Sequence, residues 1–224
     1  MRVSKIVSLG ILIAVSAIIL VHVGIKRGPT PGKALTVSEI GRAVSAQVAS
    51  PKGRGSAVYL GGVQMLTAGH VCAGMDVKQT VIISTRSRII TRVKEFIMAP
   101  RWPSVDLCIM VLEEVPTDLQ VVEISDQAAC FDDQLFLASY SGGMGYSFRS
   151  GKQLAEETVE GPKSPSQFIC ISSIYADPGA SGGPVLNSVG KLTGILILKF
   201  GETISISGYV PLEQIKEFLA VVNH

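Results

Sequence analysis

The hydrophobic positions of this chain follow two different patterns, one continuous and one interrupted. Residues 6–25 form an uncharged, mostly apolar run of 20 residues with two basic residues on either side. A helix of that length spans roughly 30 Å, which matches the hydrocarbon thickness of a bilayer. The pattern therefore predicts a transmembrane helix within residues 1–27.

A cleavable signal peptide is the alternative interpretation of this segment. The small residues Ala14-Val15-Ser16-Ala17 resemble a cleavage site, but the apolar run continues beyond them. We therefore expect an uncleaved signal anchor that contacts the lipid bilayer through residues 6–25. Its flanking charges weakly favour a cytoplasmic N-terminus, so we expect the rest of the chain outside the cytoplasm, in a periplasm or lumen. Residues 28–35 contain two prolines and two glycines and predict a short linker.

From about residue 36, short apolar runs are separated by glycines and polar turns. These runs predict strands at residues 56–60, 64–67, 81–84, 88–94, 107–112, 134–138, 167–172, 191–198 and 205–210. One segment, residues 212–222, has helical spacing, with Leu212, Ile215, Leu219 and Val222 on one stripe. Strands at this density with little helical periodicity predict an all-β domain built as barrels or a sandwich.

Composition and charge exclude two classes of function. The chain has 224 residues, of which 47% are hydrophobic and 17% charged, so we expect a packed core. Residues 1–35 carry five basic residues and no acid, which leaves 15 basic and 18 acidic residues, a net of −3, in the remainder. Nucleic-acid binders usually have the opposite sign, so we expect no nucleic-acid partner. A phosphate-binding loop is excluded because five residues, rather than four, separate Gly145 from Gly151-Lys152.

Three motifs far apart in the sequence carry the candidate chemistry. Ser181 lies in Asp177-Pro178-Gly179-Ala180-Ser181-Gly182-Gly183-Pro184, His70 ends Thr67-Ala68-Gly69-His70, and Asp106 precedes an apolar run. A serine hydroxyl becomes a strong nucleophile when an imidazole takes its proton and a third group holds that imidazole in one tautomer. The chain order His, Asp, Ser is that of the chymotrypsin-type arrangement.

Each motif alone also has a simpler structural explanation. A lone histidine is usually structural, and Ser-Gly-Gly-Pro can be an ordinary turn. Asp106 opens an apolar run, where a carboxylate needs a partner such as an imidazole N–H. Asp76 and Asp118 are alternative acids in loop-like sequence. Gly179 permits a backbone conformation in which its N–H and that of Ser181 form an oxyanion hole. The conjunction of these features favours a catalytic serine.

Together these motifs resemble the trypsin-like serine peptidases, most closely the HtrA-type branch, over about residues 36–222. The segment Gly208-Tyr209-Val210-Pro211, followed by a helix, is similar to the end of that protease domain. The resemblance implies a chymotrypsin-like double β-barrel, at roughly residues 36–120 and 121–211, with the active site between the barrels. It assigns the base to His70, the orienting acid to Asp106 and the nucleophile to Ser181. It implies no cofactor and no metal.

The chain also departs from this family's patterns. Ala180 stands where digestive trypsin-like enzymes have an aspartate and HtrA-type enzymes usually have an asparagine. No cysteine precedes His70, so the usual disulfide of that loop is absent. We expect free buried thiols as the default for Cys72, Cys108, Cys130 and Cys170, with one or two unconventional disulfides as the alternative. Only 13 residues follow Pro211, so we expect no C-terminal PDZ module.

We therefore predict a membrane-anchored serine endopeptidase that acts on proteins or peptides through an acyl-enzyme. The resemblance implies a substrate pocket at Tyr175, Ala176, Ile197 and Leu198, without an acid at its base, which favours a small or medium aliphatic side chain before the cleaved bond. A homotrimer is an expectation from the HtrA-type branch. Two alternatives remain: a catalytically inactive protease fold used as a binding scaffold, and a viral or phage maturation protease.

Overall fold

The computed structural model describes residues 34–84, 86–141, 145–161, 164–200 and 205–222. Strands dominate, and short helices lie at both ends of the described chain. In chain order the elements are α2 (Val37–Val44), β1 (Ser45–Ser50), β2 (Gly53–Gly61), β3 (Gln64–Thr67), α3 (Gly69–Ala73), the 3-10 helix η1 (Val77–Gln79), β4 (Val81–Ile83), β5 (Ile90–Met98), β6 (Cys108–Leu112), β7 (Gln134–Tyr140), β8 (Tyr146–Gly161), β9 (Ser164–Ser172), β10 (Pro184–Leu186), β11 (Leu192–Phe200), β12 (Ile206–Pro211) and α4 (Leu212–Val222).

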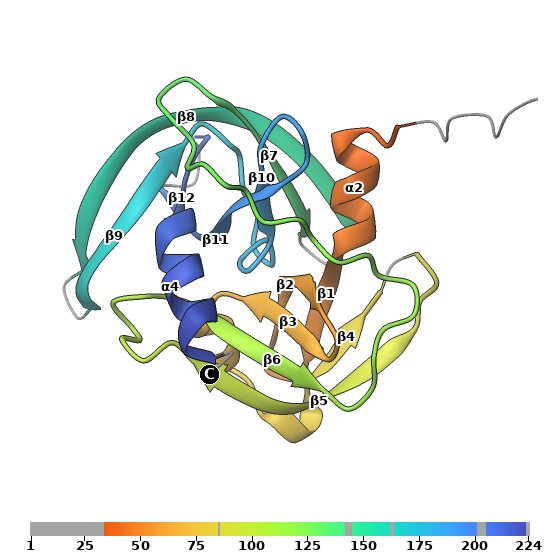
Figure 1. Ribbon diagram of the computed structural model, residues 1–224. Coiled ribbons are helices and arrows are strands. Elements are labelled where there is room, and N and C mark those ends of the chain that lie inside the picture. The colour runs from red at the N-terminus through yellow and green to blue at the C-terminus, as the bar shows by residue number, and fades with distance from the viewer. Residues whose placement is uncertain (1–33, 85, 142–144, 162–163, 201–204, 223–224) are drawn as a thin grey trace, which may run out of the picture. The chain divides into compact units, whose positions relative to one another are not determined.

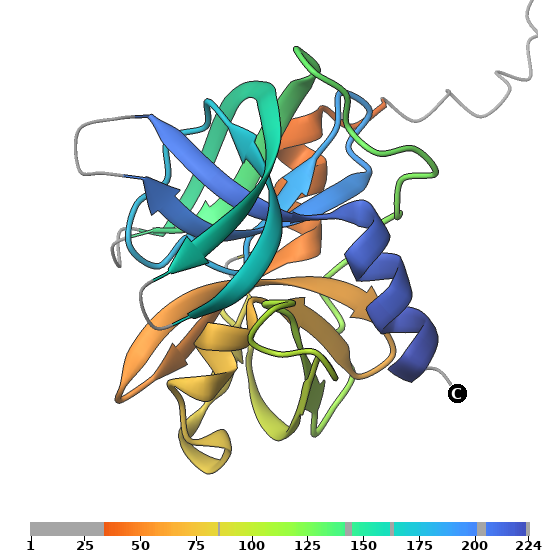
Figure 2. The ribbon, with the colours of Figure 1, turned by 90° about the vertical axis from the view of Figure 1, so that its left-hand side faces the viewer.

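The strands close into two antiparallel barrels that follow each other along the chain (Figure 1). The first barrel has the strand order β1-β2-β3-β6-β5-β4, and the second has the order β10-β11-β12-β9-β8-β7. The two barrels lie one above the other in Figure 2. Closure leaves no free sheet edge, and inward-facing apolar side chains fill each barrel. The all-β double barrel with a C-terminal helix is therefore as predicted.

Each terminal helix also contacts the barrel to which its own chain segment does not belong. Helix α2 precedes the first barrel, yet Gly41 lies so close to Ala138 of β7 that an added Cβ would come within 2.9 Å of it. The Tyr146 hydroxyl of β8 donates to the Ser38 carbonyl of α2 at 3.0 Å. Helix α4 follows the second barrel, and its Phe218 lines a hollow with Val105 of the first barrel. Helix α2 therefore links the first barrel to the second, and helix α4 links the second barrel to the first.

The helix at residues 212–222 forms as predicted, because its apolar stripe packs against the core. Helix α2 was not predicted, although the sequence carries its start signal. Thr36 and Glu39 form a reciprocal capping box, in which each side chain bonds to the other residue's backbone N–H. Strands β1 and β8 were also missed, because their polar and small residues break the alternation that marks a strand. Strand β10 was missed because its three apolar residues are too few to show a pattern.

The predicted transmembrane segment, residues 6–25, lies outside the described residues. Among the helices that the structure describes, none has both the length and the apolar character needed to cross a bilayer.

Candidate active site

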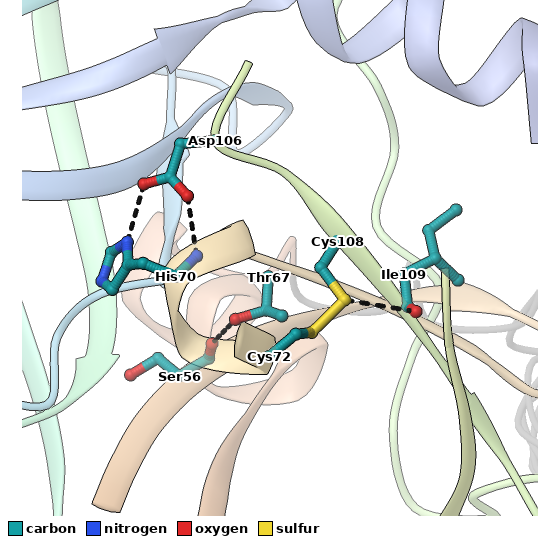
Figure 3. The surroundings of a disulfide bond; sticks show 7 residues. All are labelled: Ser56, Thr67, His70, Cys72, Asp106, Cys108 and Ile109. Carbon is teal, nitrogen blue, oxygen red and sulfur yellow. Dashed lines mark hydrogen bonds and ion pairs between the residues drawn. A yellow bond between two sulfur atoms is a disulfide. The ribbon is translucent and has the colours of Figure 1, made fainter. Parts of the chain in front are cut away.

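Sheet register brings His70 and Asp106 together. Strand β3 ends at Thr67, which pairs with Cys108, the first residue of β6. Because these strands are antiparallel, the chain leaving β3 runs beside the chain entering β6. The leaving chain turns at once into α3, which carries His70 in its first turn. Asp106, two residues before β6, lies opposite that turn (Figure 3).

The Asp106 carboxylate holds His70 by two hydrogen bonds. Asp106 Oδ1 accepts from the His70 backbone N–H at 2.7 Å, and Oδ2 lies 2.7 Å from His70 Nδ1. A carboxylate accepts here, so this geometry places the imidazole proton on Nδ1 and leaves the lone pair of Nε2 for chemistry. The Asp106 side chain is 9% exposed and that of His70 is 45% exposed. The orienting group is thus buried while the imidazole it holds faces solvent.

The backbone at Gly69 admits no side chain. An added Cβ would lie 2.5 Å from a ring atom of Trp102 and 3.0 Å from Asp106 Oδ1. The Trp102 ring therefore packs directly against the main chain that carries His70. A glycine at this position allows the indole and the carboxylate to approach the same turn.

A disulfide reinforces the contact between these two segments. Cys72 and Cys108 form a disulfide, and each lies two residues beyond His70 or Asp106 respectively (Figure 3). The prediction of four free thiols is therefore wrong for this pair. The separation of 36 residues along the sequence did not indicate this disulfide, because the pairing of the two cysteines follows from the β3–β6 register. Cys130 and Cys170 are free, the first exposed and the second buried.

Ser181 lies in the loop between β9 and β10, where Gly182 allows a close approach of the barrels. Gly182 has φ of +85°. A Cβ on it would come within 2.0 Å of Thr67 Oγ1 and 2.1 Å of the Ser56 carbonyl oxygen, both in the first barrel. The Gly182 N–H donates to the Leu196 carbonyl at 2.7 Å. The serine is thereby fixed between β11 of its own barrel and the ends of β2 and β3.

Two backbone amides at this loop stand apart from their neighbours. The N–H groups of Ala180, Gly182 and Gly183 donate to backbone carbonyls, whereas those of Gly179 and Ser181 have no acceptor among the described residues. Gly179 has φ of +93°, a conformation that favours glycine. Unsatisfied amides are uncommon in folded proteins. This alternation leaves free the same two donors that the sequence predicts for an oxyanion hole.

Ser56 of β2 connects this loop to the first barrel through several hydrogen bonds. Its N–H donates to the Ser181 carbonyl at 2.8 Å, and its hydroxyl donates to the Gly179 carbonyl at 2.9 Å. The same hydroxyl accepts from the Tyr140 N–H at 2.9 Å, and the Ser56 carbonyl accepts from the Thr67 hydroxyl at 2.7 Å. Ser56 is fully buried. Sequence reasoning missed this residue, because nothing local distinguishes it from any other serine in a strand.

Ala180 is also fully buried, in an apolar cluster with Leu137, Ala176 and Val185. The position where digestive enzymes of the resembled family have an aspartate is thus a small packing contact here. Apolar burial and the Ser56 hydrogen bonds hold this loop without an ion pair at residue 180.

His70 and Ser181 line one pocket of about 190 Å³. Both residues line the pocket, and among the described residues no hydrogen bond joins their side chains. The other lining residues come from the β1–β2 hairpin and from α3 with the turn that follows it: Lys52, Gly53, Arg54, Val71, Gly74 and Met75.

The residues predicted for the substrate pocket have mixed surroundings. Ala176 and Ile197 are buried, whereas Tyr175 and Leu198 are half-buried. Two cations that the sequence did not bring to attention flank the Tyr175 ring, with Lys199 Nζ 4.9 Å and Arg149 Cζ 5.5 Å from its centroid. Such cation–π contacts place positive charge beside the loop that leads to Ser181.

The alternative acids lie in other contacts. Asp76 caps the 3-10 helix η1 through the Lys78 N–H, and Asp118 accepts from the hydroxyls of Ser84 and Ser87. Neither acid has a bond to His70 in the described structure. No group of three or more His, Cys, Asp or Glu side chains within the described ranges is arranged to hold a metal ion.

Comparison with known proteins adds a family. A family model described as a trypsin-like peptidase domain matches residues 55–195. The fold is similar to the active form of the Rv3671c protease from M. tuberculosis, with a TM-score of 0.71, 15% identity, and coverage of 88% of this chain and 91% of that one. It is also similar to the HtrA-type protease AlgW with a tripeptide, at a TM-score of 0.71 and 19% identity, covering 84% of this chain and 62% of that one.

A serine endoprotease from Yersinia pestis is similar at a TM-score of 0.68 and 17% identity, covering 87% of this chain and 68% of that one. At these identities the likeness is one of fold. No curated protein sequence matches this chain significantly.

Proposed function

This chain belongs to the trypsin-like peptidase domain family and is a serine endopeptidase, and we propose that His70, Asp106 and Ser181 are its catalytic triad. One observation carries this proposal. A buried carboxylate accepts one hydrogen bond from the backbone N–H of a histidine and one from its imidazole, and that histidine shares a pocket with a serine whose own N–H and that of Gly179 have no acceptor among the described residues. A binding scaffold has no physical need for this combination.

The proposed reaction has two halves. His70 Nε2 takes the Ser181 hydroxyl proton while Oγ attacks the substrate carbonyl carbon, and the carbonyl oxygen becomes an oxyanion that accepts from the Gly179 and Ser181 N–H groups. His70 then gives the proton to the leaving amine as the C–N bond breaks. In the second half, water attacks the acyl-enzyme with His70 again as base, which releases the acid and restores Ser181. Asp106 stabilises the imidazolium that forms in each half.

The oxyanion donors need fixed positions for this chemistry. A preorganised donor is worth about 3 kcal/mol of transition-state stabilisation. The Gly179–Ala180 peptide is held at both ends, since its carbonyl accepts from the Ser56 hydroxyl and its N–H donates to the Asp177 carbonyl at 3.0 Å. We assign Ser56 the positioning of this loop.

We propose that residues 6–25 anchor the enzyme in a membrane, with the peptidase domain on the extracytoplasmic side. The support is the uncharged run of 20 residues and the Cys72–Cys108 disulfide, since disulfides persist in oxidising compartments. Flotation of the full-length protein with vesicles, compared with a chain lacking residues 1–27, tests the anchor. Recovery of both proteins in the unbound fraction would contradict it. Assembly into a trimer stays a prediction, which analytical ultracentrifugation would test.

An aliphatic side chain before the cleaved bond also remains our proposal. Leu198 and the ring of Tyr175 are the half-buried candidates for its contacts. Cleavage-site sequencing of a peptide library would test it, and a preference for Lys or Arg at that position would contradict it.

Fluorophosphonate labelling of the full-length protein tests the triad. We expect covalent labelling of the wild type and its loss in Ser181→Ala and His70→Ala. Ser188→Ala is the matched control, because Ser188 is an exposed serine on the turn after β10. Labelling that survives in Ser181→Ala, or a folded wild type that does not label at all, would refute the proposal.

A further inference from the structure

The hairpin between β1 and β2 brings two cations to the pocket that His70 and Ser181 share. Lys52 lies in the turn of this hairpin, and Arg54 lies on β2, where it pairs with Ala49 of β1. Both residues are exposed. The hairpin tip therefore places positive charge on one wall of the candidate active site.

Neither cation has a counter-charge in the described part of the chain. Lys52 and Arg54 form no ion pair there, and no carboxylate lines the pocket. Among the other described cations, Arg101, Arg149, Lys152 and Lys191 each contact a carboxylate, and the rest, such as Arg92 and Lys94, form no ion pair but do not line this pocket. The chain from residue 36 onward has a net charge of −3. Uncompensated positive charge at the pocket is thus a local feature that runs against the overall balance.

The backbone of the hairpin lies directly beside the nucleophile. A Cβ on Gly55 would come within 2.8 Å of Val71 and 3.3 Å of the Ser181 carbonyl oxygen. The pocket that the resemblance implies places the side chain before the cleaved bond at Ile197 and Leu198 of β11, on the other barrel. The residues after the cleaved bond then leave past His70 and the hairpin, within reach of the long side chains of Lys52 and Arg54.

We propose that Lys52 and Arg54 form a binding site for acidic side chains that follow the cleaved bond, so that the substrates are polypeptides with Asp or Glu in the first three positions after it. This inference rests on the proposed function of the same pocket. An exposed ion pair contributes up to about 1 kcal/mol, so each cation supplies up to roughly a fivefold preference. The preference decreases with added salt, because exposed charges are screened over about 8–10 Å.

Anionic lipid headgroups would also attract these two cations. A substrate polypeptide is the better fit, because the cations share a wall with His70 and Ser181, and a pocket covered by lipid cannot receive a peptide. Positive charge beside a nucleophile instead favours acidic substrates by steering their approach.

The test uses one peptide library with two readouts on full-length protein in detergent. In the first, the wild type cleaves the library, and sequencing of the new N-termini gives the residues that follow each cleaved bond. In the second, immobilised Ser181→Ala protein retains peptides from the same library without turnover. Both readouts are repeated in the Lys52→Gln/Arg54→Gln and Lys52→Glu/Arg54→Glu backgrounds. Arg92→Glu, which changes the net charge by as much as the Gln pair does, is the control, since Arg92 is exposed on β5 and does not line the pocket.

We expect Asp and Glu to be enriched on the order of fivefold after the cleaved bond, and acidic peptides to be retained by the Ser181→Ala protein. The enrichment disappears in the Gln pair, reverses toward Lys and Arg in the Glu pair, and persists in Arg92→Glu. Equal use of acidic and neutral residues by an active wild type overturns the inference. A cleavage profile that the Glu pair leaves unchanged also overturns it; weaker binding of the Glu pair than of the wild type to phosphatidylglycerol vesicles, both as chains lacking residues 1–27, then assigns the cations to lipid.

Retention of acidic peptides that depends on Lys52 and Arg54, without cleavage or fluorophosphonate labelling by the wild type, has a different meaning. It refutes the proposed catalytic function while supporting the binding site.

Discussion

The Ser56→Ala substitution tests whether the Ser56 hydroxyl positions the oxyanion loop, which is the segment Gly179–Ser181 that carries the two proposed oxyanion donors, in addition to stabilising the fold. The substitution deletes the donor to the Gly179 carbonyl and the acceptor of the Tyr140 N–H, at 2.9 Å each, and leaves the Ser56 backbone bonds in place. A buried polar group that loses its partner costs about 1–3 kcal/mol. Two such losses predict a decrease of about 2–6 kcal/mol in the free energy of unfolding.

The loss of the hydrogen bond to the Gly179 carbonyl also affects the proposed reaction, because this bond positions the loop that carries the two oxyanion donors. If about 1.4 kcal/mol of loop positioning is lost, the population with both donors aimed at the oxyanion decreases about tenfold. The oxyanion forms only in the transition state, so we expect kcat to decrease about tenfold while KM changes little. The assays are peptide hydrolysis, the rate of fluorophosphonate labelling, and urea unfolding of the same preparations.

Ser45→Ala is the matched control for this experiment. Ser45 is also fully buried on a strand of the first barrel, and its hydroxyl donates to the Gly41 carbonyl at 2.6 Å. It has no contact with the loop of Ser181, so its loss lowers stability and leaves the labelling rate unchanged. Ser56→Thr, which keeps the hydroxyl, recovers part of kcat. The reasoning is refuted if Ser56→Ala labels within twofold of the wild-type rate while losing stability to the same extent as Ser45→Ala.

Three further predictions concern the disulfide, the serine loop and the free thiols. Replacing Cys72 and Cys108 together by Ala opens a loop of 36 residues. We expect the free energy of unfolding to decrease by about 4 kcal/mol and Tm to decrease by roughly 8–15 °C. A Tm within about 2 °C of the wild type would contradict this. Gly182→Ala places a Cβ within 2.0 Å of a first-barrel hydroxyl at φ +85°, so it abolishes labelling by displacing the loop; wild-type labelling would show that the barrels can separate to admit it. Burial raises the pKa of the Cys170 thiol to about 11, so this thiol is neutral at pH 8. We therefore expect iodoacetamide to modify only the exposed Cys130 of the native protein, as measured by mass spectrometry. Two adducts would contradict this prediction.

The sequence pointed to the candidate site residues more readily than to the contacts that support them. Small residues precede His70, glycines surround Ser181, and Asp106 is a carboxylate at the start of an apolar run, where it needs a partner. Ser56 carries no such local signal. Its importance comes from a contact with Gly179, 123 residues away in the sequence, which depends on how the two barrels dock.

The same holds for secondary structure and disulfides: features set by neighbouring residues can be predicted from the sequence, and contacts between distant segments cannot. Helix α2 could have been predicted, since Thr36 and Glu39 have the spacing of a capping box. The Cys72–Cys108 disulfide could not, because it requires the register of β3 with β6, and spacing along the chain does not reveal strand pairing. The long strand β8 was missed because its residues alternate poorly between polar and apolar.

With the proposed triad, catalytic competence depends on the interface between the two barrels. The first barrel supplies His70 and Asp106, the second supplies Ser181 with its free amides, and Ser56 joins the two directly. Because residue 180 is a buried alanine, no ion pair with a newly formed N-terminus can order the loop, so the order must come from these inter-barrel bonds and from apolar packing. Such bonds form as soon as the barrels dock. We therefore expect the oxyanion loop to be ordered on folding, without a proteolytic activation step, and the terminal helices that tie the barrels together to contribute to activity as well as to stability.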